Sequence, residues 1–518
     1  MKMKTTFLLF IFTYRWLTAA SGARILAIFP YIGKSHFNAF EPFIKELAAR
    51  GHQLVVVSHF PQKHAIANYT DISLVGSIKI ESTNRVDIGK FSGLTGLKTL
   101  KKELSQYYES CDKMLSFHTI QELMKSDMVF DLVISESFFS DCFLPFVDKF
   151  KVPNIAMSSC LLLPWTNDRM ANPDNPAFVP TLLTPFLDKM SLSERIMNTV
   201  TNVGLNLFFF LTERFVTENY VHKHFGESVP KLYDLARNTS LVLVNTHFSL
   251  NRPHPLVPGV VEVGGLHIRP PKKLPKDLED YLDGAEHGLI LFSMGSMLRA
   301  DSLPADKRDA FLQAFSELPQ RVLWKWEMRN MPLQPENVKT AEWLPQFDII
   351  NHPNVRLYLG HGGLLGTTEA VYAGVPMVGI PMFGDQAMNV KAIEVAGMGL
   401  TLDLNDITKE NVLRVLRTVL YEPSYRENAK RMSKVYQDRP MSAMDTAIYW
   451  TEYVIRHKGA PHLRTAALDL AWYQYFLLDV LAVIMVCVTI LLFVTYVVLK
   501  KLTRGIFSPK PKNKLKLS

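Results

Sequence analysis

Between residues 343 and 386, short apolar runs alternate with glycine-rich turns, and this alternation constrains the fold more than any other feature of the chain. The apolar run 355–359 ends at a Gly-His-Gly-Gly turn (360–363), a helix-compatible segment follows, and 375–380 is the next buried run. A strand, turn and helix in this order can bind phosphate, because the first N–H groups of a helix lack internal partners and carry the positive end of the helix dipole. The segment predicts a parallel α/β sheet with an anion site, although a plain tight turn is the alternative.

The first half of the chain shows the same alternation. Residues 24–29 form a buried-strand run, 36–50 have helical periodicity and 53–57 form the next strand, which together make a βαβ unit. Further strand-like runs continue this sheet or begin a second one: 130–134, 154–157, 241–244, 289–293 and 321–325. The pattern predicts two doubly wound, Rossmann-like α/β domains.

Proline density marks the boundary between these domains, because six prolines fall between residues 253 and 275. The expected parts are an N-terminal domain at 23–250, a linker at 251–287, a second domain at 288–440, and a returning helix with a juxtamembrane segment at 441–475.

Both ends of the chain carry targeting features. Residues 1–22 have the basic start, short apolar core and small-residue end of a signal peptide, with an uncleaved anchor as the alternative. Residues 480–499 contain no charge, so we expect a transmembrane helix at 476–499 and a basic cytosolic tail at 500–518. The tail ends in a dilysine-like retrieval pattern. These features predict a single-pass type I protein of the endoplasmic reticulum membrane with lumenal domains, in which Asn68 and Asn238 are glycosylation sequons.

Composition excludes several classes of protein. The net charge of +8 is concentrated in the tail, and the rest of the chain is nearly neutral, so no nucleic acid is expected as a partner. The four cysteines are not spaced like metal ligands, and Cys111, Cys142 and Cys160 can form at most one disulfide among them. There is no Asp-x-Asp motif to hold a metal.

Two features of the first domain have more than one interpretation. His36 lies where the first strand's loop meets the following helix, at the sheet edge where a neutral imidazole can take a proton from a hydroxyl; a helix cap or surface residue is the alternative. The apolar patch 205–210 fits either a core or a membrane surface, and we favour the core.

The pattern of 343–386 resembles the signature of the UDP-glycosyltransferases, a family of the GT-B superfamily. The resemblance rests on His361, the glycine pair after it, Glu369 eight residues on, the spacing of two prolines, and the final Asp385 and Gln386. It continues in GKSHF (33–37) and in FSMGS (292–296), and it covers nearly the entire chain.

Two positions depart from that signature. Many relatives have Thr or Ser where this chain has Gly360, and many have Asn where this chain has Leu365. Leu365 cannot donate to a phosphate, but a Leu-Leu pair after the two glycines is familiar among insect members, which the chain resembles most.

The resemblance implies a GT-B fold, in which two Rossmann-like domains face a cleft and the second binds a UDP-sugar. Trp343 and Gln346 are the implied contacts of the uracil, Glu369 of the ribose, and His361 of the diphosphate. The complete implied donor site is Ser293, Gly295, Ser296, Trp343, Gln346, His361, Gly363, Glu369, Asp385 and Gln386.

The same resemblance implies that His36 is the catalytic base. Its carboxylate partner is either Glu136 or Asp141, which both follow the strand at 130–134. We favour Asp141, because insect relatives often carry this acid within the triplet Ser140-Asp141-Cys142. A helix cap is the alternative role for either acid.

The implied activity is an inverting transfer from a UDP-sugar, with glucose favoured over glucuronate, to a small lipophilic acceptor such as a phenol, flavonoid, steroid or xenobiotic. The UDP-sugar is a co-substrate, and no further cofactor or metal is expected. The lipid bilayer is a partner through one helix, and the sequence does not indicate an oligomeric state. The alternatives are an inactive GT-B binding protein of the lumen and a membrane receptor with a lectin-like ectodomain.

Overall fold

The computed structural model describes residues 22–79, 86–88, 108–328 and 330–507, and it divides into a large unit that ends at Arg464 and a small unit that begins at Thr465. The predicted signal peptide, apart from Gly22, and residues 508–518 of the basic tail lie outside the described residues.

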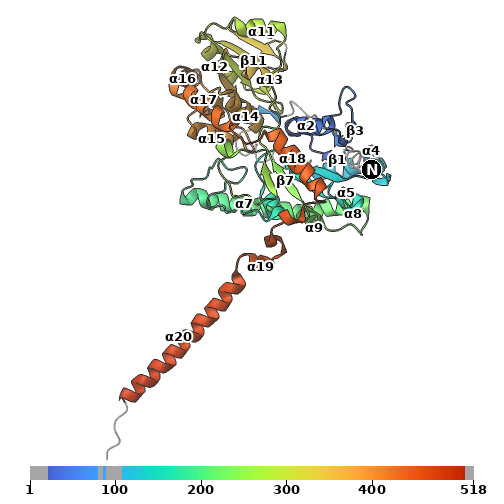
Figure 1. The fold of residues 1–518 in the computed structure, drawn as a ribbon. Coiled ribbons are helices and arrows are strands. Elements are labelled where there is room, and N and C mark those ends of the chain that lie inside the picture. The colour runs from blue at the N-terminus through green and yellow to red at the C-terminus, as the bar shows by residue number, and fades with distance from the viewer. Residues whose placement is uncertain (1–21, 80–85, 89–107, 329, 508–518) are drawn as a thin grey trace, which may run out of the picture. The chain divides into compact units, whose positions relative to one another are not determined.

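The large unit begins with a sheet of seven parallel strands in the order β3-β2-β1-β5-β6-β7-β8. Figure 1 labels β1, β3 and β7 of this sheet. Its strands are β1 Arg24–Phe29, β2 Gln53–Ser58, β3 Tyr69–Ser73, β5 Leu132–Glu136, β6 Asn154–Ser158, β7 Leu241–Val244 and β8 Val260–Glu262. The assignment of residues 251–287 to a linker is wrong for β8, which pairs with β7. Three residues are too few to show strand periodicity among so many prolines.

Both faces of this sheet are covered, as continuous apolar strands require. In β1, Ile25 and Phe29 face one cluster while Leu26 and Ile28 face the other, because side chains alternate along a strand. Helices of this part include α2 Lys34–Ala49, α4 His118–Lys125, α5 Pro145–Phe150, α6 Pro164–Met170, α7 Leu192–Thr212, η2 Glu213–Thr217, α8 Glu218–Phe225, α9 Leu232–Arg237 and α10 Phe248–Asn251.

A second sheet has six parallel strands in the order β12-β11-β9-β13-β14-β15. They are β9 Leu289–Ser293, β11 Arg321–Lys325, β12 Val338–Ala341, β13 Val355–Gly360, β14 Met377–Gly379 and β15 Gly399–Thr401. Its helices are α11 Lys276–Asp283, α12 Ala305–Ser316, α13 Gln346–Ile350, α14 Leu364–Ala373, α15 Gln386–Val395, α16 Lys409–Tyr421 and α17 Pro423–Gln437. These two doubly wound sheets are the architecture that the sequence predicts.

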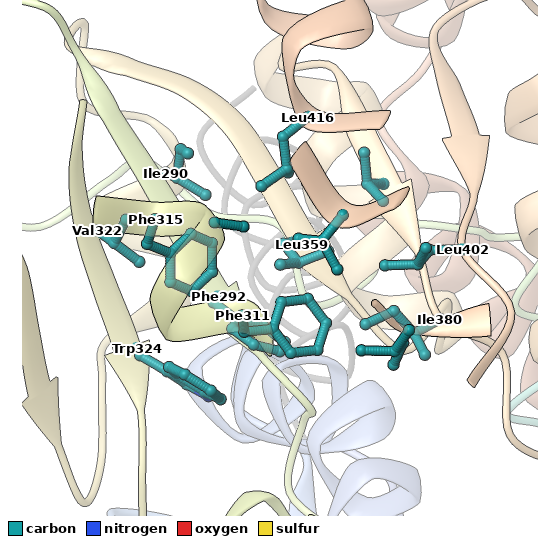
Figure 2. Close-up of a cluster of buried hydrophobic side chains, with 14 of the residues drawn as sticks. Ile290, Phe292, Phe311, Phe315, Val322, Trp324, Leu359, Ile380, Leu402 and Leu416 are labelled. Atoms are coloured by element: carbon teal, nitrogen blue, oxygen red, sulfur yellow. The ribbon is translucent and has the colours of Figure 1, made fainter. Parts of the chain in front are cut away.

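Aromatic side chains pack among aliphatic ones in the core on one face of the second sheet (Figure 2). Phe292 of β9 stacks on Trp324 of β11 with ring centroids 4.5 Å apart, and Phe311 and Phe315 of α12 cover both rings. This core supports the strand ends that form the site.

The chain returns from the second sheet to the first through α18, Ala443–Arg456. Ala447, Ile448 and Val454 belong to the same buried cluster as β1 and α2. Asp445 also accepts a hydrogen bond of 2.8 Å from Arg50, which follows α2. Part of the first domain's core is therefore supplied by residues that come after the second domain.

The small unit contains the short helix α19, Trp472–Tyr475, and the long helix α20, Leu478–Phe507. Within residues 478–504, an 18-residue window has a mean hydropathy of 2.9, and none of that window is buried. By length and composition α20 can cross a membrane, where the sequence predicts a span at 476–499.

The apolar patch 205–210 is not the core element that we favoured. Phe209 is buried and Leu205 is half-buried, but Leu207, Phe208 and Phe210 are exposed on the surface of α7. The spacing of apolar residues shows that they lie on one face of a helix, but it does not show whether the rest of the protein buries that face.

The packing of α18 leads to a prediction. Ile448 is 1% exposed, so Ile448→Ala lowers the free energy of unfolding by about 2–5 kcal/mol through lost burial and the cavity left behind. Tyr449→Ala, at a neighbour that is 45% exposed, has a much smaller effect and is the matched control. Pulse proteolysis across a urea series measures both, and equal midpoints for the two variants would show that α18 is not part of this core.

Candidate functional site

A cavity of about 1070 Å³ lies where the carboxyl ends of the strands of both sheets meet. It brings together His36 from the first domain and all ten predicted donor-binding residues from the second, which are Ser293, Gly295, Ser296, Trp343, Gln346, His361, Gly363, Glu369, Asp385 and Gln386. Glu136 and Asp141 do not line it. The two acids must therefore act, if at all, through other residues.

His36 lies in the first turn of α2 and is held by two polar contacts. Its Nδ1 atom is 2.6 Å from Oε1 of Glu136 and 2.8 Å from Oγ of Ser159. The rings of Tyr31 and Phe138 flank it at centroid distances of 4.3 and 4.4 Å. With its proton on Nδ1, the ring donates to the Glu136 carboxylate, and the opposite nitrogen, Nε2, is the basic atom.

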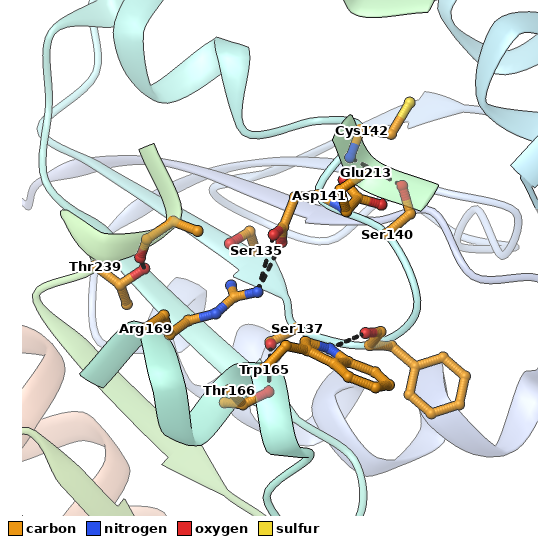
Figure 3. A network of polar contacts seen from close by, with 12 residues as sticks. Ser135, Ser137, Ser140, Asp141, Cys142, Trp165, Thr166, Arg169, Glu213 and Thr239 are labelled. Atoms are coloured by element: carbon orange, nitrogen blue, oxygen red, sulfur yellow. Dashed lines mark hydrogen bonds and ion pairs between the residues drawn. The ribbon is translucent and has the colours of Figure 1, made fainter. Parts of the chain in front are cut away.

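Glu136 is therefore the partner of His36, and the preference for Asp141 is wrong. Arg169 Nη2 donates to both carboxylate oxygens of Asp141, at 2.9 and 3.0 Å, and both side chains are buried (Figure 3). The backbone N–H of Asp141 donates to Glu213. Burial raises the pKa of Glu213 well above its usual range, and the nearby charge of Asp141 raises it further. Asp141 thus belongs to a structural network.

The preference for Asp141 was wrong because the two acids lie at different positions relative to the end of β5. Glu136 is the last residue of β5, so it reaches the carboxyl edge of the sheet together with the end of β6. Asp141 lies beyond the strand, next to Cys142, which forms a disulfide with Cys111. Ser159, the other contact of His36, follows β6 and was missed by the sequence analysis. The sequence did contain a signal for it, because Ser158 and Ser159 form a pair of serines at the end of an apolar run.

The predicted anion site is built around His361, which follows β13 and precedes α14. Its ring is so close to two glycines that a Cβ would lie 2.5 Å from the ring at Gly295 and 2.4 Å at Gly363. Burial, and secondarily the charge of Lys325, lower the pKa of His361 to about 4, so the imidazole is neutral at neutral pH. Its buried Nδ1 has no hydrogen-bond partner among the described residues.

Lys325 is a second residue that the sequence analysis missed. It ends β11, lines the same cavity, and forms a buried 2.6 Å ion pair with Glu327. Its Nζ atom lies 5.9 Å from the centre of the Trp343 ring. A lysine at the carboxyl end of an apolar strand was the available signal, since strand ends of both domains point to the site.

The departure at Gly360 has a structural explanation. The ring of Tyr358 occupies the space beside Gly360, where a Cβ would lie 2.6 Å from Cζ and the hydroxyl oxygen. A Thr or Ser at position 360 would displace this buried tyrosine. Leu365 lines the cavity and packs against the buried cluster of the first domain, so it contributes an apolar contact between the domains.

The nucleoside part of the cavity contains a polar pair and an exposed ring. Gln346 Nε2 donates to Oε2 of Glu369 at 2.7 Å, and the Trp343 ring is available for stacking. Burial raises the pKa of Glu369 to about 7, although the hydrogen bond from Gln346 opposes this shift.

The last two predicted donor residues lie at the start of α15. Asp385 accepts a 2.9 Å hydrogen bond from Asn389. Burial raises the pKa of Asp385 above its usual value, although this hydrogen bond and, more weakly, His36 across the cavity oppose the shift. Gln386 Oε1 accepts hydrogen bonds from the N–H groups of Met382 and Phe383, which leaves its Nε2 to donate to a ligand.

The remaining predicted sites are at the surface. Asn68 and Asn238 are both exposed, although Asn68 Nδ2 donates to the carbonyl of Ala48. Within the described part of the chain, no three His, Cys, Asp or Glu side chains are grouped as ligands for a metal.

Comparisons with known proteins agree with the family resemblance found in the sequence. The family described as UDP-glucoronosyl and UDP-glucosyl transferase matches residues 25–513. The chain is 44% identical to UDP-glycosyltransferase UGT5 of Dactylopius coccus, over 95% of this chain and 94% of that protein. It is 40% identical to UDP-glucosyltransferase 2 of the same species, over 96% and 97%. It is 32% identical to UDP-glucuronosyltransferase 1A7 of Homo sapiens, over 91% and 90%.

Two solved structures are similar and confirm the GT-B fold. The glycotransferase of kitacinnamycin has a TM-score of 0.58 at 15% identity, with 83% of this chain and 99% of that chain covered. The UDP-glucose: anthocyanidin 3-O-glucosyltransferase in complex with UDP has a TM-score of 0.55 at 18% identity, with 84% and 99% covered.

The two acids near His36 make a matched pair of variants. Glu136→Gln lowers the kcat of sugar transfer by roughly 10²-fold or more, because an amide does not stabilise the imidazolium of His36, while the urea midpoint stays close to wild type. Asp141→Asn instead lowers the free energy of unfolding by about 3–5 kcal/mol, because Arg169 is left buried without its counter-charge.

Kinetics of the folded fraction and a urea titration check both statements. If Asp141→Asn lost kcat while Glu136→Gln kept it, the assignment of partners would be reversed.

Proposed function

Because the chain belongs to the family of UDP-glucuronosyl and UDP-glucosyl transferases, we propose that it transfers glucose from UDP-glucose to a hydroxyl of a small lipophilic acceptor, with inversion at the anomeric carbon. The contact between His36 and Glu136 at the wall of a cavity shared by both domains carries this proposal.

In the proposed reaction, Nε2 of His36 takes the proton of the acceptor hydroxyl, and Glu136 stabilises the imidazolium that forms. The acceptor oxygen forms a bond to the anomeric carbon from the face opposite UDP. The bond from that carbon to the diphosphate oxygen breaks, and UDP leaves with the electron pair. The retained base and acid are the argument against an inactive binding protein of the same fold.

The charge that develops on the diphosphate is stabilised by groups of the second domain. The free N–H groups at the start of α14 and the neutral His361 can donate to it. Lys325 lines the same cavity, and its ammonium, whose charge is balanced by Glu327, has further N–H groups that can donate to a diphosphate. Leu365 has no such donor.

The acceptor side of the cavity carries several large apolar side chains, together with the polar Ser35, Asn38, Ser110 and Ser159. Tyr31, Phe138, Phe139, Leu182 and Leu183 of the first domain line it. Such a wall favours a lipophilic acceptor, since a polar one would lose hydrogen bonds to water without replacement.

Glucose is favoured over glucuronate on electrostatic grounds. The acidic side chain of Asp385 lies across from His36, where a glucuronate carboxylate would meet like charge. The cationic side chains that line the cavity, Arg269 and Lys325, are paired with Asp348 and Glu327. The relative named UDP-glucosyltransferase 2 supports the same preference.

We also propose that α20 anchors the protein in the endoplasmic reticulum membrane, with the cavity in the lumen. The Cys111–Cys142 disulfide supports this side of the membrane, because disulfides persist in oxidising compartments. The exposed sequons at Asn68 and Asn238 are compatible with the same compartment.

Microsomes that contain the full chain, supplied in turn with UDP-glucose and UDP-glucuronate and with mixed phenol and steroid acceptors, test the function by the mass added to each acceptor. We expect the mass of a hexose. His36→Ala lowers kcat by roughly 10²–10⁴-fold and leaves UDP binding largely intact. Equal turnover in that variant would refute the role of the base, and product with glucuronate alone would refute the donor.

The raised pKa of Glu369 gives a pH dependence for donor binding. The carboxylate accepts the ribose hydroxyls better than the protonated acid does, and its pKa of about 7 means that it ionises between pH 6 and 8. We expect the Kd of UDP-glucose, whose diphosphate does not titrate here, to rise about tenfold from pH 8 to pH 6. His361, with a pKa of about 4, does not titrate in this range.

Calorimetry on the detergent-solubilised chain measures this slope. In Glu369→Gln the slope disappears and binding at pH 8 is weaker. A slope that persisted in this variant would assign the titration to another group.

A further inference from the structure

The helix α7 is amphipathic, but its polar side faces the protein interior and its apolar side faces outward. This is the reverse of a helix on the surface of a water-soluble protein. Its buried positions include Asn198 and Asn202, and the chain continues inward with the buried Glu213 and Thr217 of η2. Its exposed positions are largely apolar. We call the exposed apolar residues of α7, together with Phe215 of η2, the α7 apolar face: Leu192, Ile196, Met197, Val200, Val203, Leu207, Phe208, Phe210, Leu211 and Phe215.

The orientation of α7 is fixed by its inward amides. Asn198 accepts a 2.8 Å hydrogen bond from the N–H of Thr181 and donates to the carbonyls of Pro176 and Val179, each at 2.8 Å. Asn202 donates to Asp174 at 2.8 Å. Rotation of the helix to bury its apolar side would take away the Asn198 amide from the N–H of Thr181 and the carbonyls of Pro176 and Val179, which is unfavourable for buried polar groups. The apolar face is therefore held outward.

The α7 apolar face is continuous. Leu192, Ile196, Val200, Val203 and Leu207 recur at intervals of three or four residues, so they form one stripe. The helix has 21 residues and is roughly 30 Å long at 1.5 Å per residue. An apolar surface of this extent marks an interaction site, unlike single exposed apolar residues.

The end of the large unit lies close to this face. The ring of Phe210 contacts the ring of Tyr233 in α9 at a centroid distance of 6.2 Å. Arg237, the last residue of α9, accepts through its carbonyl a 2.7 Å hydrogen bond from Arg464. Arg464 ends the large unit, and only residues 465–477 separate it from α20. The segment that leads to the proposed membrane span thus starts beside α9 and the α7 apolar face.

We propose that the α7 apolar face lies in the interface of a lipid bilayer, between headgroups and acyl chains, as a second membrane contact of the same chain. A helix with one apolar and one polar side binds in this plane by burying its apolar side to a depth of roughly 5–10 Å. A bilayer fits better than a protein partner, because residues 465–477 hold the body within a short distance of the membrane that α20 can cross.

A fluorescent probe at Leu207 tests the proposal in the full chain reconstituted in nanodiscs. Leu207→Cys is made in a Cys487→Ser background, in which the remaining free cysteine, Cys160, is buried, and is labelled with nitrobenzoxadiazole. Tyr421→Cys is the matched control, because Tyr421 of α16 is 53% exposed and Leu207 is 55% exposed. Lipids with a doxyl group near the headgroup should quench the probe at 207 at least about twofold more than the probe at 421.

Equal quenching at the two positions would overturn the proposal. So would a disulfide between two copies at position 207 under copper phenanthroline, since a second copy would then cover the face. Sugar transfer by each labelled chain shows that it is folded.

A second measurement needs no variant. Photoreactive lipids in microsomes should label peptides from residues 192–215 of the unmodified chain as well as α20. Label on α20 alone would equally overturn the proposal, while label on neither would contradict the membrane anchor as well.

Discussion

All the strands of the two large sheets run parallel, and the site depends on this constraint. In a parallel sheet the carboxyl end of every strand reaches the same edge. Ser293, Lys325 and Gly360 end β9, β11 and β13 at one such edge, and Glu136 ends β5 at the other. Because the two edges share one cavity, residues from distant parts of the chain, such as His36 and Glu369, line the same space.

Burial gives His361 and Glu369 the ionisation states that the proposed chemistry needs. His361 stays neutral because it is buried near Lys325, and a neutral imidazole can donate to a phosphate without adding a titrating charge at neutral pH. Glu369 is held close to the point of ionisation for the same reason, so a ligand that hydrogen-bonds to its carboxylate shifts that equilibrium. Of these two groups, His361 keeps a buried Nδ1 without a hydrogen-bond partner among the described residues, while Glu369 accepts a hydrogen bond from Gln346.

The strands could be predicted because they depend on local sequence, and continuous apolar runs identified β1, β9 and β13. The family resemblance named ten residues that line the cavity in the structure, and their role in donor binding stays a prediction. The choice between Glu136 and Asp141 could not be made in this way, since it depends on Arg169, whose proximity to Asp141 is a product of the tertiary fold.

The contrast between local sequence and tertiary contacts also explains the other features that the sequence analysis did not predict. Gly360 is understood only when the ring of Tyr358 is seen beside it, and the outward face of α7 only when the hydrogen bonds of Asn198 are known. β8 is too short to be recognised, and its strand conformation comes from pairing with β7. Each of these outcomes depends on contacts between segments that are distant in the sequence.

The position of α18 has a consequence for the order in which the protein is made. In topological terms the second domain is an insertion into the first, because Ala447, Ile448 and Val454 complete a core that begins at β1. During synthesis the second domain leaves the ribosome whole, while the first still lacks part of its interior. The domain that carries His36 is therefore begun first and completed last, shortly before α20 emerges.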